Sequence, residues 1–94
     1  MHAVMVRVKV DTSREDEARQ VLRDVVVPTA KALPGFTRGD WIRALDSDEG
    51  LSVLLFDSED AARSAVEQIR SQGPPTGVPV TMQSVTAYEV VEQA

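Results

Sequence analysis

The stretch LSVLLFDSEDAARSAVEQI, residues 51–69, holds a strand, a helix cap and an amphipathic helix in direct succession. Leu51 to Phe56 is apolar at all but one position, so this strand is expected at the centre of a sheet with both faces covered. Asp57 or Ser58 can cap the helix that follows. The apolar stripe of that helix comprises Ala62, Ala65, Val66 and Ile69.

A second strand is predicted just before the central one, over Phe36 to Leu45. Its alternation places Trp41 and Arg43 on one face and the side chains at positions 40, 42 and 44 on the other. The stretch from Asp46 to Gly50 is short and polar and ends in a glycine. It is therefore predicted to join the two strands as a hairpin.

The N-terminal part of the chain is predicted to form a strand and a helix of the same kind. Ala3 to Lys9 alternates strictly, which indicates a strand. Thr12 and Glu15 have the spacing of a capping box, and the helix that begins there has an apolar stripe of Ala18, Val21, Leu22, Val25 and Val26. Pro28 lacks a backbone donor, so a kink or break is expected there, before Pro34-Gly35 ends the segment.

The C-terminal part completes the fold. After a Gly/Pro loop over residues 73–77, Val78 to Val91 predicts a last strand, with a bulge because its alternation is imperfect. The element order is βαββαβ. Right-handed crossovers then predict a ferredoxin-like α+β fold with antiparallel strand order 4-1-3-2 and both helices on one face. The 94 residues are expected to form a single domain, residues 1–94.

Composition narrows the classes of function. The net charge of −5 and the pI near 4.7 argue against nucleic acid or an anionic membrane surface as a partner. The chain has no cysteine, so disulfides and thiolate chemistry are excluded. No apolar run approaches the roughly 18 residues of a membrane span, and no signal pattern is present. A cytoplasmic location is therefore predicted.

Two short motifs carry a family resemblance: Pro34-Gly35-Phe36, which enters the second strand, and the passage FDSEDA, residues 56–61, from strand to helix. With these, the chain resembles the dimeric α/β barrel superfamily, and within it the antibiotic biosynthesis monooxygenase-like group. The resemblance implies a homodimer in which two sheets associate face to face, with a cavity in the barrel or between sheet and helices. Some members oxidise polycyclic phenols with dioxygen and no cofactor, and others cleave heme.

The catalytic residues of these relatives do not carry over. The resemblance leads us to expect a histidine in the second helix of monooxygenase members, but residues 61–67 contain none. Heme-cleaving members use an asparagine on the first strand and a histidine and a tryptophan on the second helix. This chain has no asparagine, and Trp41 lies on the predicted second strand.

The sheet face opposite the helices is predicted to be too apolar for water. It would carry Met5, Trp41 and one side of the central strand, and a second copy of the chain is expected to cover it. The competing arrangement is a monomer in which Val90 to Ala94 folds back over the patch.

A candidate ligand pocket is predicted from alternation. If Arg7, Trp41 and Arg43 all face the barrel interior, two guanidinium groups and an indole converge on one semi-apolar space that suits a planar anionic or phenolic molecule. Tyr88 can join them as a hydroxyl donor. Alternatively, Trp41 fills the dimer interface while the two arginines pair with acidic residues at its rim.

Metal and cofactor sites are not predicted. His2 is the only histidine and lies at the chain start, where a solvated side chain is the ordinary state. The acidic cluster of Asp46, Asp48 and Glu49 is interpreted as a solvated hairpin loop. No second nitrogen or sulfur ligand accompanies His2, and no phosphate-binding glycine motif occurs.

Two hypotheses of function follow. We favour a non-catalytic dimeric module that binds an aromatic small molecule or serves in assembly, because no catalytic set is identifiable. The alternative is a cofactor-independent monooxygenase-like enzyme that acts on an aromatic or polyketide-type substrate.

Overall fold

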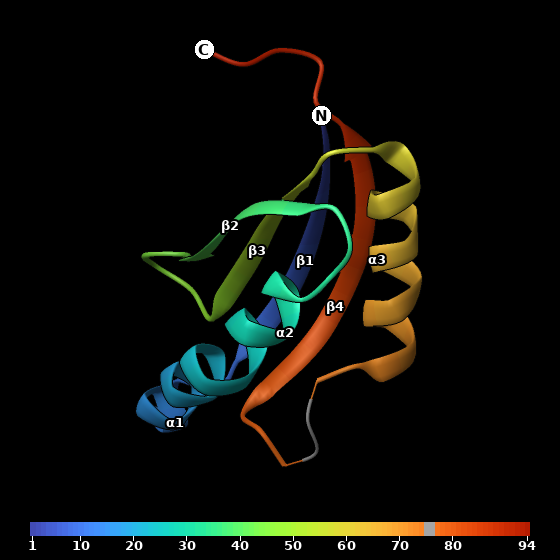
Figure 1. Cartoon of the computed structure of the whole chain (residues 1–94). Helices are drawn as coiled ribbons and strands as arrows, with labels where there is room; N and C mark the ends of the chain where they lie inside the picture. The colour runs from blue at the N-terminus through green and yellow to red at the C-terminus, as the bar shows by residue number, and fades with distance from the viewer. Residues whose placement is uncertain (75–76) are drawn as a thin grey trace.

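Four strands form an antiparallel sheet in the order β2-β3-β1-β4 in the part of the chain that the structure describes. In this computed structural model the described residues are 1–74 and 77–94. The strands are β1 (His2–Val10), β2 (Phe36–Arg43), β3 (Glu49–Phe56) and β4 (Val80–Glu89). The helical segments are η1 (Thr12–Arg14), α1 (Glu15–Val21), η2 (Leu22–Val26), α2 (Val27–Lys31) and α3 (Glu59–Gln72). The predicted ferredoxin-like topology and the central place of β3 are confirmed, and Figure 1 shows the helices in front of the sheet and beside it.

The first helical segment runs from Glu15 to Lys31 with a change of pitch. Asp11, and not the predicted Thr12, caps the short turn η1 that precedes it, since the Asp11 carboxylate accepts from the Ser13 backbone N–H at 3.1 Å. The stretch η2 is π-helical and lies just before Pro28, which cannot donate a helical hydrogen bond. The predicted disruption at Pro28 therefore takes the form of a widened turn, through which the helix continues into α2.

The second helix, α3, begins and ends as the sequence indicates. Ser58 is the cap, with its hydroxyl accepting from the Ala61 N–H at 3.1 Å. The predicted stripe faces the sheet, and Gly73 ends the helix with a φ of +62°. Pro75 and Thr76, in the middle of the predicted loop, lie outside the described residues.

The core lies between the sheet and the helices α2 and α3. Val4 and Phe56 are completely buried at its centre. Ala30 and Leu33 from the α2 region and Ala62, Ala65 and Val66 from α3 complete it with Val6, Leu54 and Val85. The segments α1 and η2 contribute no buried residue. The first half of the long helix therefore stands away from the sheet.

Two irregularities interrupt the strands. Opposite β1, residues Met82 and Ser84 of β4 pair with consecutive residues, so Gln83 is an extra residue and the predicted bulge in the last strand is confirmed. A second bulge, which the alternation did not predict, lies in β2. Phe36 and Arg38 pair with consecutive residues of β3, and the hydroxyl of the extra residue, Thr37, donates to the Leu55 carbonyl at 3.0 Å.

The β2 bulge decides the direction of Trp41. Plain alternation from Phe36, whose ring packs edge-on against Phe56 in the core, would turn Trp41 to the face without helices. The extra residue reverses this parity, so Phe36 and Trp41 both lie on the helix side of the sheet. The prediction that Trp41 lies with Met5 on the face without helices is therefore wrong.

Candidate functional site

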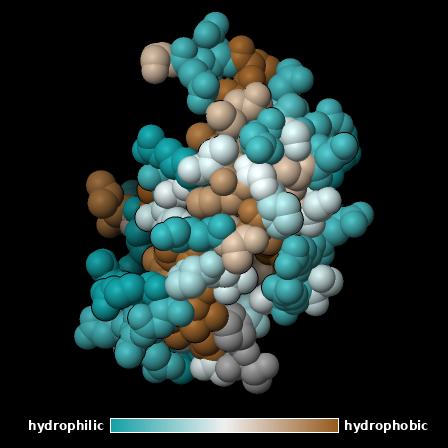
Figure 2. Space-filling model, in the orientation of Figure 1, coloured by the Kyte–Doolittle hydropathy of each residue, from teal (hydrophilic) through white to brown (hydrophobic). Residues whose placement is uncertain are grey.

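A cavity of about 410 Å³ lies between the sheet and the first helical segment. The apolar stripe of α1 and η2 points toward the strands, but none of its side chains is fully buried against them. The roof comprises Ala18, Val21, Leu22, Val25 and Val26. In Figure 2, hydrophobic side chains gather low in the middle of this face, between the hydrophilic surfaces over α1 and α3.

The floor of the cavity is built by alternate residues of the strands. β1 contributes Val6, Val8 and Val10, β2 contributes Trp41, and β4 contributes Val80 and Met82. Gly39, two residues before Trp41 on the same face, leaves space for the indole, since a Cβ there would lie 2.7 Å from the ring. The indole therefore lies along β2 as a flat apolar wall.

One end of the cavity is polar. A single oxygen of the Glu15 carboxylate, Oε1, accepts from Arg19 Nη2 at 3.1 Å and from Arg43 Nη1. The hydrogen bonds from Arg19 and Arg43 hold the pKa of Glu15 below its ordinary value. The Nε of Arg43 is buried and has no hydrogen-bond partner. This cluster joins the start of α1 to the end of β2 across the cavity.

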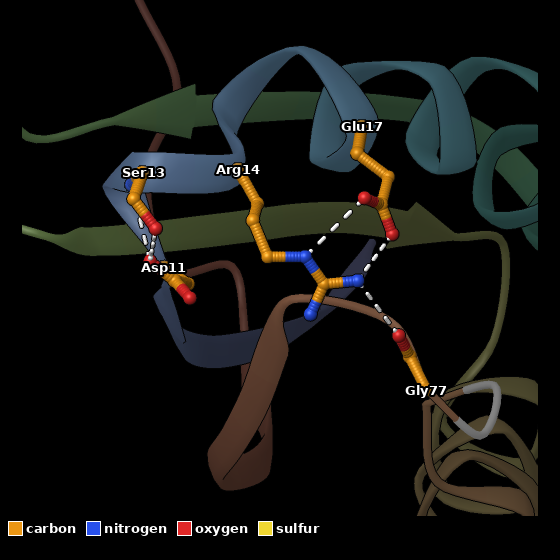
Figure 3. A network of polar contacts seen from close by, with 5 residues as sticks. All are labelled: Asp11, Ser13, Arg14, Glu17 and Gly77. Atoms are coloured by element: carbon orange, nitrogen blue, oxygen red, sulfur yellow. Dashed lines mark hydrogen bonds and ion pairs between the residues drawn. The ribbon is translucent and has the colours of Figure 1, made fainter.

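A second polar network holds the beginning of the roof. Figure 3 shows the Arg14 guanidinium between the Glu17 carboxylate and the Gly77 carbonyl, which accepts from Arg14 Nη2 at 3.1 Å. The Asp11 carboxylate accepts from the Ser13 hydroxyl at 2.7 Å, and this hydrogen bond lowers the pKa of Asp11. The roof is thus tied at its start by charged contacts and at its far end by the packing of α2.

The structure divides the four predicted site residues into two pairs. Trp41 and Arg43 line the cavity on the helix side. Arg7 and Tyr88 lie on the opposite face, where Arg7 Nε is 3.6 Å from a Glu49 oxygen and Tyr88 is 49% exposed. The four do not converge, because the bulge in β2 turns its two members away from the face that Arg7 shares with Met5.

Sequence reasoning missed Glu15, Arg19 and Gly39 as parts of the site. Glu15 and Arg19 resemble ordinary charges on the solvent side of a helix, and only the position of Arg43 brings them to the cavity. The valine-rich stripe at 21, 25 and 26 was the available signal, but the same periodicity describes a helix packed into a core.

Other candidate sites lie elsewhere or are absent from the described chain. His2 does not line the cavity, and its side chain is not solvated as expected but 21% exposed, with Nε2 4.0 Å from a Glu59 oxygen and a buried Nδ1 without a partner. Residues 1–74 and 77–94 contain no group of three or more acidic, histidine or cysteine side chains arranged to hold a metal ion. Within the same ranges, no helix has the length and hydropathy needed to cross a lipid bilayer.

The βαββαβ order of elements and the antiparallel strand order β2-β3-β1-β4 place the chain among the small ferredoxin-like α+β proteins. Residues 1–68 match the antibiotic biosynthesis monooxygenase family, and the chain belongs to that family. No curated protein sequence matches it.

Several solved structures share the fold. The heme-degrader MhuD from Mycobacterium tuberculosis aligns with a TM-score of 0.75 and 17% identity, over 100% of this chain and 99% of that one. SnoaB, a cofactor-independent oxygenase from Streptomyces nogalater, aligns with a TM-score of 0.73 and 19% identity, over 98% and 94%. HapK from Hahella chejuensis aligns with a TM-score of 0.65 and 16% identity, over 100% and 96%.

A heme does not fit the residues of this cavity. No histidine, cysteine or tyrosine lines it, so a heme iron would find only the Met82 thioether as an axial ligand on the described walls. Apart from Trp41 and the Glu15 cluster, the described walls are mainly aliphatic, with the polar side chains of Thr29, Ser52, Gln68 and Gln72 among them.

Proposed function

We propose that this protein binds a small, largely apolar, ring-containing molecule in the cavity between the sheet and the first helical segment. The observation that carries the proposal is a cavity of about 410 Å³ with mainly aliphatic walls and one indole, roofed by helical segments without a fully buried residue. Its size is within the roughly 300–1,000 Å³ of pockets that hold small ligands. A ring can stack on Trp41 and displace water from the valine floor.

Binding without catalysis agrees best with the titratable groups of the cavity. Those on the described walls are Glu15, Arg19 and Arg43, and both arginines donate to the Glu15 carboxylate. A general base needs a free lone pair within hydrogen-bond reach of the substrate, and its pKa should lie near the working pH. The carboxylate of Glu15 has a lowered pKa, which makes it a weak base.

Cofactor-independent oxygenation is the second candidate, and the family supports it. In that reaction the substrate phenolate itself would donate the electron to dioxygen, so no protein base is strictly required. Incubation with an anthrone-type phenol under oxygen tests it. Turnover above buffer that is lost in Trp41→Ala would make the protein an enzyme, whereas no turnover would leave it a binding module.

The binding proposal is tested with N-phenyl-1-naphthylamine, a neutral probe whose fluorescence rises in apolar sites. Leu22→Trp places a large side chain into the cavity from η2, and Arg23→Trp places the same side chain on the adjacent, exposed position outside the walls. We expect saturable binding to the wild type and to Arg23→Trp, and a loss of about tenfold or more in Leu22→Trp. Equal affinity in all three proteins would refute binding in this cavity.

We also propose that a second copy covers the sheet face without helices. On this face, cross-strand neighbours include Met5 with Val53 and Ala3 with Leu55 and Tyr88, which form a continuous apolar area across three strands. The oligomeric state in solution tests this proposal.

A cytoplasmic location stays a prediction.

A further inference from the structure

The polar end of the cavity indicates the charge of its ligand. The charged residues on the described walls are Glu15, Arg19 and Arg43, which sum to +1 in a chain whose net charge is −5. The net charge of the cavity walls is therefore opposite in sign to the net charge of the whole chain.

Glu15 satisfies only part of the hydrogen-bonding capacity of the two arginines. Both guanidinium groups donate to the same oxygen, Oε1, while two guanidinium groups together offer ten N–H donors. Arg43 has a buried Nε with no partner. The cluster thus retains donors, and a ligand carboxylate that presents both oxygens could satisfy more of them than the single Glu15 oxygen does.

Glu15 is also the partner that can leave. Its side chain is 36% exposed, against 30% for Arg43, and it belongs to a helix without buried residues. Released from Arg43, its carboxylate can turn into water, whereas Arg43 is attached to a strand of the sheet. An exchange of carboxylates at Arg43 therefore requires movement of the partly exposed Glu15 side chain.

We propose that the ligand is an amphipathic anion, with its ring system between Trp41 and the valine floor and its acidic group on Arg43 and Arg19 in place of Glu15. This inference rests on the proposed binding function and adds the charge of the ligand. Glu15 acts as an internal competitor that occupies the two arginines while the cavity lacks a ligand. It leaves the apolar surface of the cavity open to neutral molecules.

Two probes of similar ring structure separate charge from apolar contact. 8-Anilinonaphthalene-1-sulfonate carries a sulfonate, and N-phenyl-1-naphthylamine lacks it. Arg43→Gln should weaken binding of the sulfonate by about tenfold or more, since charge-assisted hydrogen bonds to a partly buried guanidinium are lost. The neutral probe should change by less than about twofold, because its contacts are apolar.

Four further variants complete the design. Arg38→Gln is the matched control, an exposed arginine on β2 that pairs with Asp40 outside the cavity, and should leave both affinities unchanged. Arg43→Lys retains the charge and should keep part of the preference for the sulfonate. Glu15→Gln should raise sulfonate affinity several-fold, because the competing carboxylate is gone. Arg19 is 68% exposed, so Arg19→Gln offers a variant that should fold normally and weaken the sulfonate less than Arg43→Gln.

The outcomes distinguish the two proposals. Equal losses for both probes in Arg43→Gln, or unchanged sulfonate affinity in both Arg43→Gln and Arg19→Gln, would overturn the anionic ligand and leave cavity binding intact. The proposed function itself would be overturned if neither probe bound the wild type, or if both probes bound Leu22→Trp with the same affinity as the wild type.

Discussion

Gly35 occupies the turn between α2 and β2 with a φ of +76°, a conformation that side chains disfavour. A Cβ there would also lie 2.6 Å from the Cβ of Ala61 and 2.6 Å from Oδ1 of Asp57. The preceding Pro34 has no comparable constraint and mainly restricts the unfolded chain. The two residues of this motif therefore have different physical roles.

Gly35→Ala should lower the free energy of unfolding by about 2 kcal/mol or more, because strain at positive φ adds to a close contact. Pro34→Ala should cost less than about 1 kcal/mol. Urea denaturation of both variants measures the difference. Equal losses would mean that the turn relaxes around the added methyl group.

Gly39 is the second glycine with a steric role, because it leaves space for the Trp41 ring. Gly39→Ala should displace the indole, shift its emission and weaken binding of the neutral probe several-fold. Asp40→Ala, on the other face of the same strand, is the control and should leave emission unchanged. Unchanged emission in Gly39→Ala would show that a methyl group fits beneath the ring.

At the scale of elements, the two helical segments are held in different ways. α3 packs three buried side chains into the core, whereas α1 and η2 bury none and are held by ion pairs and by the continuation into α2. Solvent-exposed ion pairs contribute little each. We therefore expect α1 and η2 to exchange their amide hydrogens faster than α3.

The cap of α3 provides a prediction for one element. Ser58→Ala removes the hydroxyl that accepts from the Ala61 N–H and should cost about 1 kcal/mol in the free energy of unfolding. Ser64→Ala, at an exposed position within the same helix, is the control and should be neutral or slightly stabilising. Equal stability of the two variants would contradict a stabilising role of the Ser58 cap.

The tie between α1 and β2 should depend on pH. Hydrogen bonds from Arg19 and Arg43 lower the pKa of Glu15 in the folded chain, so the unfolded state binds a proton more readily. The contribution of this carboxylate is therefore complete at neutral pH and is lost as the pH falls below about 4. Glu15→Gln should flatten this part of the stability profile measured by denaturation between pH 3 and 7, whereas Glu67→Gln should not.

At the scale of the whole molecule, the sheet has one face under the helices and one without them (Figure 1). The chain after β4 does not cover the second face. It continues past the end of the sheet, and Val91 is 83% exposed. The arrangement in which Val90 to Ala94 folds back over the patch is therefore not the one observed.

A homodimer through this face should dissociate when a charge is placed at its centre. Val53 lies on central strand β3, beside Met5 and directly opposite Asp40, and Val53→Glu would bury a second carboxylate next to that of Asp40 in the interface. Light scattering at micromolar concentration should give a dimer for the wild type and a monomer for the variant. Thr81→Glu, an exposed change at the start of β4, is the control. A monomeric wild type would contradict the proposal.

The sequence alone determined the order of elements, the central position of β3, the stripe of α3 and the bulge in β4. These features depend on residues close together in the chain, where spacing of 2 or 3.6 and a cap or proline are sufficient. Trp41 and Arg43 were also identified as members of one face for the same reason.

Only the tertiary structure decided that the face with Trp41 and Arg43 is the one under the helices, and that it borders the cavity. One extra residue at Thr37 reverses the parity of β2, and a register change of a single residue leaves the apolar pattern nearly unaltered. The cavity likewise depends on how far α1 and η2 stand from the sheet, which their stripe does not encode. The partnership of Arg43 with Glu15 joins residues 28 positions apart, and it exists because β2 and α1 meet only in the folded molecule.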